Sequence, residues 1–297
     1  MREAVLVGNM SSRHGKRLFV AARTLLEQRG LSVAASHPVA DHRELRRVVK
    51  AAAAARAPLV VVAGGDGSQT IAAGALAHAE TVLGVIPAGT GNSFAQTLGI
   101  GTHLESAIDA IVNGTVVEVD LGIVNGTYFA NFTTLGLSSE IAGDTPRWLK
   151  NAFGVVAYGV EALVPLLYHR ALQCNVKYAK NRLNFMTHQI IVANGRYYGD
   201  KPLLPQASIV DGCLTFFATR SASRFEALKT YVALARGTQQ RLNDAEFFEA
   251  PSMTIQADRK MPVAIDGNLL EKTKCARFEI ARKALRVMVP AGFNGQS

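Results

Sequence analysis

The chain has 297 residues, of which 48% are hydrophobic and 19% charged, a composition that excludes a disordered, collagen-like or low-complexity protein. The length suits about two domains. Lys and Arg outnumber Asp and Glu by 32 to 23, which gives a net charge of +9. This charge favours anionic partners such as nucleotides, nucleic acid or an acidic membrane surface, although an ordinary basic soluble protein has the same charge.

The first 120 residues alternate short apolar runs with helical patterns. Four strands are predicted, at residues 4–7, 31–35, 59–63 and 82–86. Four helices are predicted between and after them, at residues 16–28, 41–56, 69–78 and 93–98. Asp41 is suited to cap the second helix. The alternation predicts a parallel sheet with right-handed crossovers, which is a Rossmann-like α/β domain.

The pattern changes after about residue 120 and becomes rich in strands. Strands are predicted at 128–132, 172–178, 187–193, 213–218, 252–257 and 261–265, with helical segments near 146–169 and 222–236. We therefore predict a nucleotide-binding α/β domain over residues 1–120 and a β-sandwich-rich domain over 121–284. A last strand at 285–289 has no partner that propensity identifies, and the segment 285–297 is expected to return to the first domain.

Two glycine loops follow neighbouring strands of the predicted parallel sheet. Gly64-Gly65-Asp66-Gly67 follows the buried run 59–63, and Gly89-Thr90-Gly91-Asn92 follows the run 82–86. Glycines let the backbone approach a ligand closely, and a helix N-terminus supplies unpaired N–H groups and a positive dipole end. The two loops therefore predict a phosphate site at the carboxyl edge of the sheet. Neither loop fits a P-loop or a Rossmann fingerprint.

Asp66 is the unusual residue in the first loop, because a carboxylate repels phosphate. It is suited to this place if it holds a metal ion or accepts a proton from a substrate hydroxyl. The alternative is a tight turn in which the Asp side chain caps its own backbone. In the second loop, Thr90 and Asn92 offer a hydroxyl and an amide for phosphate or metal-bound water, and Ser93 is expected to cap the next helix.

The two loops together resemble the catalytic domain shared by diacylglycerol kinases, sphingosine and ceramide kinases and the bacterial soluble lipid kinases. The resemblance extends over nearly the whole chain, through Asn9 and the loop after it, Asp120-Leu121-Gly122, Asn131 to Gly136, Asp211-Gly212-Cys213-Leu214, and Asp266-Gly267. It implies a kinase that uses ATP and Mg²⁺ to phosphorylate a lipid hydroxyl, such as that of diacylglycerol or a sphingoid base. It also implies a cleft between an NAD-kinase-like α/β domain and a β-sandwich.

The same resemblance implies two sets of binding residues. Those carried over as nucleotide contacts are Asn9, Ser36, Gly64, Gly65, Asp66, Gly67, Ser68, Gln69, Thr70, Gly89, Thr90 and Gly91. Those carried over as a structural magnesium site, mostly through backbone oxygens, are Ser208, Asp211 and Cys213. An ordinary turn is the alternative for Asp211-Gly212.

Two positions depart from the family pattern. Ser93 stands where many bacterial members have an Asp, and Asn268 stands where the family's Asp-Gly-Glu turn has a glutamate proposed as general base. Asparagine cannot take a proton at neutral pH. The candidate catalytic residues are therefore Asp66, as the preferred base, Asn92 beside it, and Glu271. Glu271 is either a replacement base or a solvated hairpin residue.

Two other functions stay open on the sequence alone. The chain could be a nucleotide- or lipid-binding regulator with little kinase activity, because Ser93 and Asn268 replace acids. It could also be a small-molecule kinase related to NAD kinase, which shares a Gly-Gly-Asp-Gly loop. The second glycine loop and the later lipid-kinase turns count against that relation.

Location and partners are indicated by three further features. The three cysteines, Cys174, Cys213 and Cys275, are odd in number and far apart, which predicts no disulfide framework and a reducing cytoplasm. The basic and aromatic segment 147–150, with the apolar stretch 151–168 after it, predicts either peripheral contact with the inner membrane surface or a core helix. No zinc-finger spacing or RNP-like strand occurs, so nucleic acid is not an expected partner. A homodimer is left open.

Overall fold

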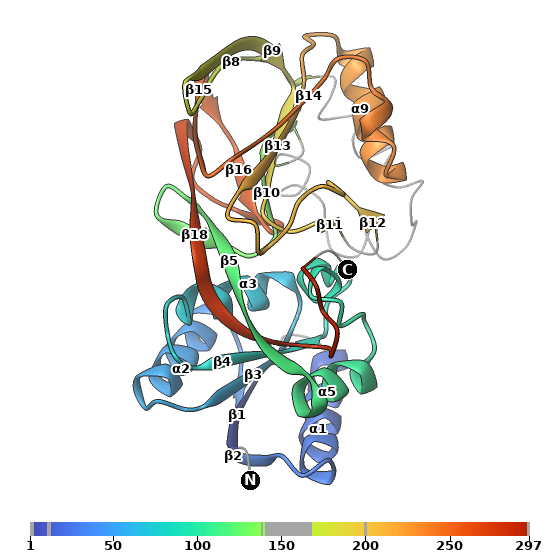
Figure 1. The fold of residues 1–297 in the computed structure, drawn as a ribbon. Coiled ribbons are helices and arrows are strands. Elements are labelled where there is room, and N and C mark those ends of the chain that lie inside the picture. The colour runs from blue at the N-terminus through green and yellow to red at the C-terminus, as the bar shows by residue number, and fades with distance from the viewer. Residues whose placement is uncertain (1–2, 11–12, 138, 140–167, 199–200, 296–297) are drawn as a thin grey trace.

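A computed structural model describes residues 3–10, 13–137, 139, 168–198 and 201–295. The predicted helix near 146–169, with its membrane-contact segment, lies almost entirely outside the described residues. Figure 1 shows an α/β unit that carries the N-terminus and a strand-rich unit above it, joined by two long strands. The predicted fold class is confirmed: a parallel sheet with helices is followed by a domain of antiparallel sheets.

The N-terminal sheet has the parallel order β2-β1-β3-β4. Its strands are β1 (Glu3–Asn9), β2 (Ser32–Val39), β3 (Leu59–Gly64) and β4 (Val82–Pro87). Its helices are α1 (Arg13–Gln28), α2 (His42–Ala54), α3 (Asp66–Ala75), α4 (Ser93–Thr97) and α5 (Leu104–Asn113). Every residue of β3 is buried, as expected for a central parallel strand with both faces covered.

Among the helices α2 to α5, the start of α2 has a side-chain cap and the other three have none. Asp41 caps α2 as predicted, because its carboxylate accepts from the backbone N–H groups of Arg43 and Glu44, both at 2.8 Å. The predicted cap at Ser93 is wrong, since Ser93 is the first helical residue and Asn92 is the cap, with a left-handed φ of 54°. The third helix begins at Asp66 rather than at residue 69, so the glycine loop itself contributes the first helical turn.

The C-terminal domain packs two antiparallel sheets on each other. Its strands are β6 (Thr127–Phe129), β7 (Phe132–Gly136), β8 (Leu172–Tyr178), β9 (Asn181–Thr187), β10 (Gln189–Ala193), β11 (Tyr197–Tyr198), β12 (Lys201–Pro202), β13 (Leu214–Thr219), β14 (Ala245–Ala250), β15 (Ser252–Met261), β16 (Val263–Ile265) and β17 (Asn268–Leu269). One sheet has the order β14-β13-β10-β7-β16-β17, and the other includes β15-β8-β9. Buried apolar side chains from both sheets form one core, among them Leu135, Val192, Phe216, Ile255 and Phe278.

Several predicted boundaries in this domain needed correction. The strand predicted at 128–132 is two strands, β6 and β7, which pair with different partners on either side of Asn131. The strand predicted at 187–193 covers the end of β9 and all of β10. The helix predicted near 222–236 is α9 (Arg224–Arg236), followed by the short 3₁₀ helix η1 (Gln239–Arg241).

Two long strands, β5 (Thr115–Val124) and β18 (Thr273–Val289), are shared by both units. The start of β18 pairs with β15, and its end pairs with β4 in parallel at Val287 and Leu83. β5 runs antiparallel along β18 over much of its length. The final predicted strand thus has its partners in β4 and β5. Both predicted domain boundaries fall inside these shared strands, so the exact division of the chain stays a prediction.

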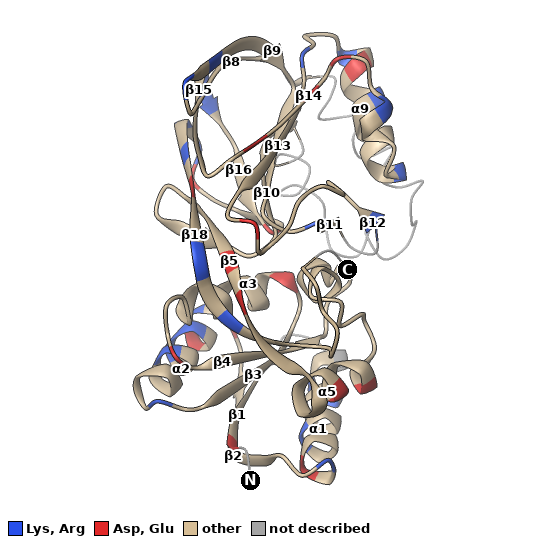
Figure 2. Cartoon of the chain, in the orientation of Figure 1, with Lys and Arg blue, Asp and Glu red and all other residues tan. Residues whose placement is uncertain are grey.

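Charge and hydropathy add two observations. In Figure 2 the Lys and Arg residues, coloured blue, lie on α2, along β18 and on α9, among other elements, rather than gathered on one of them. In the part of the chain that the structure describes, no helix combines the length and the apolar character needed to cross a membrane.

Candidate functional site

The two glycine loops meet at the carboxyl edge of the parallel sheet. A Cβ atom placed on Gly89 would lie 2.7 Å from the Cα of Gly65, and one placed on Gly65 would lie 3.1 Å from the Cα of Gly89. Backbone therefore packs directly on backbone, which only glycine permits. Asn9, at the end of β1, joins the same place, because its Nδ2 donates to the Ser68 hydroxyl at 3.3 Å. The ends of β1, β3 and β4 therefore lie together at this edge of the sheet.

Asp66 links the two loops. Its Oδ1 accepts a hydrogen bond from the backbone N–H of Phe94 in α4, at 3.1 Å. Burial raises the pKa of this carboxyl above its ordinary value, and hydrogen bonds from the backbone of Phe94, Ser93 and Asn92 oppose that rise. A Cβ on Gly91 would lie only 2.8 Å from Asp66 Oδ2, so glycine at that position makes room for the acid. Asp66 is thus a carboxylate with raised basicity that faces the second loop.

Asn92 closes the second loop on itself. Its Oδ1 accepts from the backbone N–H of Gly89 and its Nδ2 donates to the Gly89 carbonyl, both at 2.9 Å. This reciprocal pair leaves Gly89 and Thr90 exposed at the tip of the loop. Asn92 therefore shapes the loop, while the residues before it are the ones open to a ligand.

Gln69 joins the ends of β3 and β4 from below the loops. Its buried Nε2 lies 2.9 Å from the carbonyl oxygen of Val62 and 3.3 Å from those of Gly64 and Ile86. Its side chain points into the sheet, so the contribution of Gln69 to the site is to fix the strand ends that carry the loops.

A hairpin from the C-terminal domain closes over α3. The turn between β16 and β17 is Asp266-Gly267, and both residues have a left-handed φ, 44° and 83°, as in a type I′ turn. The carboxylate of Asp266 accepts from the hydroxyl of Thr70 in α3 at 2.5 Å. Asn268, the residue after this turn, lies against the first glycine loop, because a Cβ placed on Gly67 would lie 2.7 Å from Asn268 Nδ2.

Asp266 was not among the predicted site residues. An Asp-Gly pair between two apolar runs is the sequence signal for such a hairpin, but nothing local reveals its partner. Besides Thr70, the carboxylate accepts from the backbone N–H groups of Phe132 at 2.8 Å and Ala130 at 3.1 Å. Burial is the main cause that raises the pKa of Asp266 to about 6.

A second contact between the two units surrounds Asn131, which opens the Asn-to-Gly element seen in the sequence. Asn131 Oδ1 accepts from the Thr97 hydroxyl of α4 at 2.8 Å, and its Nδ2 donates to the carbonyl of Tyr197. The second glycine loop therefore leads into a helix that is tied to the C-terminal domain, as α3 is through Asp266.

Two predicted site residues lie apart from the loops. Glu271 is exposed in the segment between β17 and β18, and no hydrogen bond or ion pair within the described residues joins it to the glycine loops. Ser36 lies on β2, the edge strand, in register with Leu6 of β1. Its hydroxyl oxygen is buried without a hydrogen-bond partner among the described residues.

The turn that the resemblance implies as part of a structural magnesium site lies immediately before β13. Asp211 Oδ1 accepts from the backbone N–H of Cys213 at 2.9 Å, as in an ordinary Asx turn. Asp120 accepts from the backbone N–H of Gly212 at 2.7 Å. The Arg282 guanidinium covers this turn, because a Cβ on Gly212 would lie 2.6 Å from its Nε.

The charges around this turn bear on metal binding. Burial raises the pKa of Asp211, the Asp120 carboxylate raises it further, and Arg282 opposes the rise. Ser208, the third side chain of the predicted set with Asp211 and Cys213, donates to the carbonyl of Gly295 at 3.1 Å. Among the described residues, no group of three or more His, Cys, Asp or Glu side chains is arranged to hold a metal ion. Arg282 supplies the positive charge beside the two acids.

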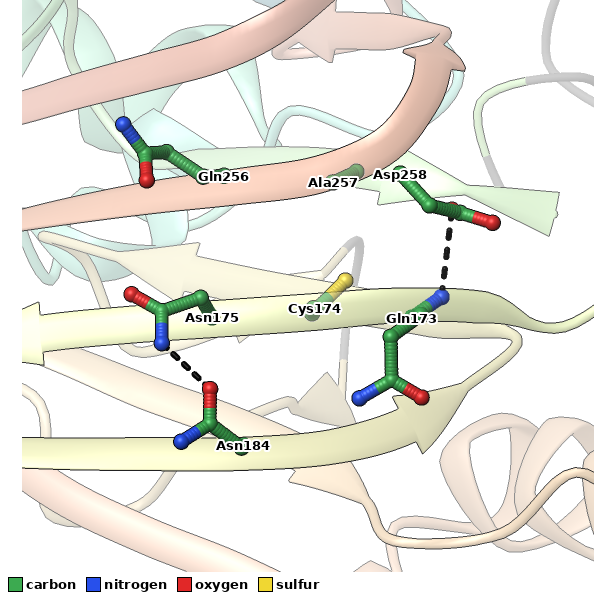
Figure 3. Close-up of a pocket in the computed structure, with 7 residues that line it drawn as sticks. All are labelled: Gln173, Cys174, Asn175, Asn184, Gln256, Ala257 and Asp258. Atoms are coloured by element: carbon green, nitrogen blue, oxygen red, sulfur yellow. Dashed lines mark hydrogen bonds between the residues drawn. The ribbon is translucent and has the colours of Figure 1, made fainter.

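A separate pocket lies on strands β8, β9 and β15, away from the glycine loops (Figures 1 and 3). Its polar groups bond to one another: Asn175 donates to Asn184, and the backbone N–H of Gln173 donates to Asp258 at 3.2 Å. Burial raises the pKa of the Cys174 thiol to about 12, so the thiolate needed for nucleophilic chemistry is scarce there. The glycine loops are therefore the stronger candidate for the reaction site.

Comparison with known proteins gives matches over both units. The family model described as the diacylglycerol kinase catalytic domain matches residues 3–124. The one described as the YegS C-terminal NAD kinase beta sandwich-like domain matches residues 134–289.

Two relatives illustrate the similarity. A Pseudomonas aeruginosa (strain UCBPP-PA14) protein named "Probable lipid kinase YegS-like" is 32% identical over 253 residues, covering 84% of this chain and 82% of that protein. The diacylglycerol kinase of Bacillus subtilis (strain 168) is 28% identical over 278 residues, covering 90% of each. A crystal structure of a diacylglycerol kinase from Bacillus anthracis has a TM-score of 0.71 at 21% identity, over 97% of this chain and 96% of that one. This structure shows that the fold is shared.

Proposed function

The chain is a kinase of the diacylglycerol kinase catalytic-domain family, and from that premise we propose that it uses ATP and Mg²⁺ to phosphorylate the hydroxyl of a membrane lipid, such as diacylglycerol or a sphingoid base. The observation that carries the proposal is the direct contact between the two glycine loops, with Asp66 linking them. Two adjacent glycine loops beside a helix N-terminus, with Gly89 and Thr90 exposed, suit a polyphosphate. A single acid at that place is suited to accept the proton of the lipid hydroxyl.

Asp66 is proposed as the proton acceptor. The lipid hydroxyl oxygen bonds to the γ-phosphorus, the bond from that phosphorus to the β-bridging oxygen breaks, and ADP leaves. The hydroxyl proton passes to Asp66, whose pKa is raised by burial and whose carboxylate is therefore a better base than an exposed one. Neither Asn268 nor the exposed Glu271 offers a comparable acid at the loops.

Magnesium fits the donor chemistry present at the loops. Mg²⁺ prefers hard oxygen ligands and is commonly held by one or two carboxylates together with substrate phosphates. Asp66 is the carboxylate here, so it would hold the ion that arrives with the nucleotide through water, which leaves the carboxylate able to accept the hydroxyl proton. The ion would supply positive charge to the phosphate oxygens during transfer.

Kinase assay of the full chain with γ-labelled ATP, Mg²⁺ and a panel of extracted and defined lipids tests the proposal. Label transferred to a lipid supports it. Asp66→Asn keeps an oxygen that can accept from Phe94 N–H but removes the base, so turnover should fall by about 10²–10⁴-fold while ATP still binds. Unchanged turnover in this variant would remove Asp66 as the base.

Two outcomes of the same assay point to other functions. ATP and lipid binding without transfer would indicate a regulator, for which the amide of Asn268 in place of an acid is the favouring observation. Phosphorylation of NAD rather than lipid would indicate an NAD-kinase-like enzyme.

A lipid substrate requires contact with a membrane surface, which we include in the proposal as peripheral binding at the inner membrane face. Cosedimentation with vesicles that contain anionic lipid tests it, since the net charge of +9 favours such a surface. Failure to sediment at low salt would contradict peripheral binding and leave the kinase proposal standing.

A further inference from the structure

A buried carboxylate joins the C-terminal domain to the helix that carries the proposed base. Asp266 is 8% exposed, and its two oxygens accept from the hydroxyl of Thr70 and from backbone N–H groups of Ala130 and Phe132. An ionised carboxylate is an acceptor only, so this set of donors matches it. Removal of either side of such a buried interaction leaves polar groups without partners, which is costly.

The position of Thr70 gives this interaction a consequence for the proposed reaction. Thr70 lies one helical turn after Asp66, so both side chains project from the same face of α3. Asp66 is close enough to Asp266 for its charge to raise the pKa of Asp266. A shift of α3 relative to the β16–β17 turn would therefore move Asp66 relative to the C-terminal domain.

The β16–β17 turn also brings Asn268 against Gly67 of the first glycine loop. The β16–β17 hairpin has a two-residue loop, so the place of Asp266 fixes the place of Asn268. Asn268 lies against Gly67, with its Nδ2 2.7 Å from a Cβ built there. Asp266 and Asn268 thus hold the same turn against α3 at two points, Thr70 and Gly67.

We propose that Asp266 is a positioning residue for phosphoryl transfer, which acts through Thr70 to hold α3 and its Asp66 at a fixed place relative to the C-terminal domain. The inference rests on the proposed kinase function, in which nucleotide binds the glycine loops and the acceptor lipid enters from the C-terminal side. Small displacements of reacting groups cost about 10²-fold in rate. Loss of the Asp266–Thr70 bond should therefore slow transfer much more than it weakens ATP binding.

Three variants of the full chain test this: Asp266→Asn, Thr70→Val and the double variant. Each should lower kcat by at least about 10-fold, with the ATP dissociation constant, measured by titration without lipid, within about twofold of wild type. Because the two residues act through one bond, the double variant should lower kcat no more than the worse single variant. Thr70→Ser keeps the hydroxyl and should recover most of the kcat lost in Thr70→Val.

Matched controls separate positioning from general destabilisation. Thr230→Val removes the hydroxyl of another buried helical threonine, which donates to the carbonyl of Glu226 in α9. It should leave kcat unchanged. If Asp266→Asn does not fold, the kcat values of Thr70→Val and Thr70→Ser still test whether the Asp266–Thr70 bond positions α3.

Three results would overturn the inference: full kcat in Thr70→Val, additive losses in the double variant, or an ATP affinity that falls as far as kcat. The last result would instead make Thr70 a nucleotide contact. Absence of lipid phosphorylation by the wild-type chain would defeat the proposed function. Hydrogen exchange would then still test the bond, since Thr70→Val should speed exchange in residues 130–132 and Thr230→Val should not.

Discussion

Substitution of Gly89 by alanine tests the claim that the two glycine loops form one site. The added Cβ would lie 2.7 Å from the Cα of Gly65 and 3.2 Å from Asn92 Oδ1, whereas carbon atoms in contact are normally about 3.5–4.0 Å apart. The nearer neighbour is backbone and cannot rotate away, so the loops must separate by up to about 1 Å. Overpacking of this kind costs about 1–3 kcal/mol of folding free energy.

The loss of ATP binding is the specific part of this prediction. Saturating ATP, at about 100 times its dissociation constant, should stabilise the wild-type chain by about 2.7 kcal/mol. In Gly89→Ala the separated loops should lose most of that stabilisation. Thermal unfolding with and without ATP measures both the basal change and the shift caused by the nucleotide.

Gly30→Ala is the matched control. Gly30 has a left-handed φ of 84° and no atom within 4 Å of a built Cβ, so its replacement costs about 1–2 kcal/mol through backbone strain alone. It should lower stability to a similar extent and keep the full ATP shift. An ATP shift in Gly89→Ala equal to that of wild type would refute the shared site.

Three further predictions concern buried groups. Gln69→Leu removes the donor that faces three strand-end carbonyls and should cost about 1–3 kcal/mol in urea unfolding; a smaller loss would show that the strand ends do not depend on it. Because burial raises the pKa of Asp266 from 3.8 to about 6, the folded state binds this proton more tightly than the unfolded state. Its contribution to the unfolding free energy, on the order of 3 kcal/mol, is therefore present below about pH 4 and lost as the pH rises through about 6. Urea unfolding across this range should show that slope in wild type, and an identical slope in Asp266→Asn would contradict the assignment. Finally, Cys174, with a pKa raised to about 12, should resist iodoacetamide in the native chain near pH 8 and react after denaturation, as mass spectrometry would record; rapid native labelling would contradict its burial.

Local patterns were enough to predict the four parallel strands of the N-terminal sheet and the place of the two glycine loops. The apolar run 59–63 is a central strand buried on both faces, and Asp41 caps α2 through its immediate neighbours. These features depend on residues that are close together in the chain, so composition and spacing reveal them. The turn type of the Asp-Gly hairpin at 266–267 also follows from its two residues, although at the level of the sequence they entered only as part of the family resemblance.

Two of the errors lie where neighbouring strands read as one. Others are elements that were not predicted, among them α5 (Leu104–Asn113), β5 (Thr115–Val124) and β14 (Ala245–Ala250). Residues 128–132 and 187–193 form continuous strand-like patterns, but each is divided between two strands with different partners. Propensity reports that a residue suits a pleated surface and does not report which strand pairs with it.

The amino-acid sequence alone determined the buried strand at residues 59–63 and the two glycine loops, with Asp66 in the first of them. Each of these features follows from neighbouring residues and from the steric freedom of glycine. Tertiary structure alone decided that Gly65 touches Gly89, that Thr70 bonds to an aspartate 196 positions away, and that the last strand inserts beside β4. These contacts join segments whose separation along the chain leaves no trace in local propensity, and only the packing of the two sheets brings them within reach.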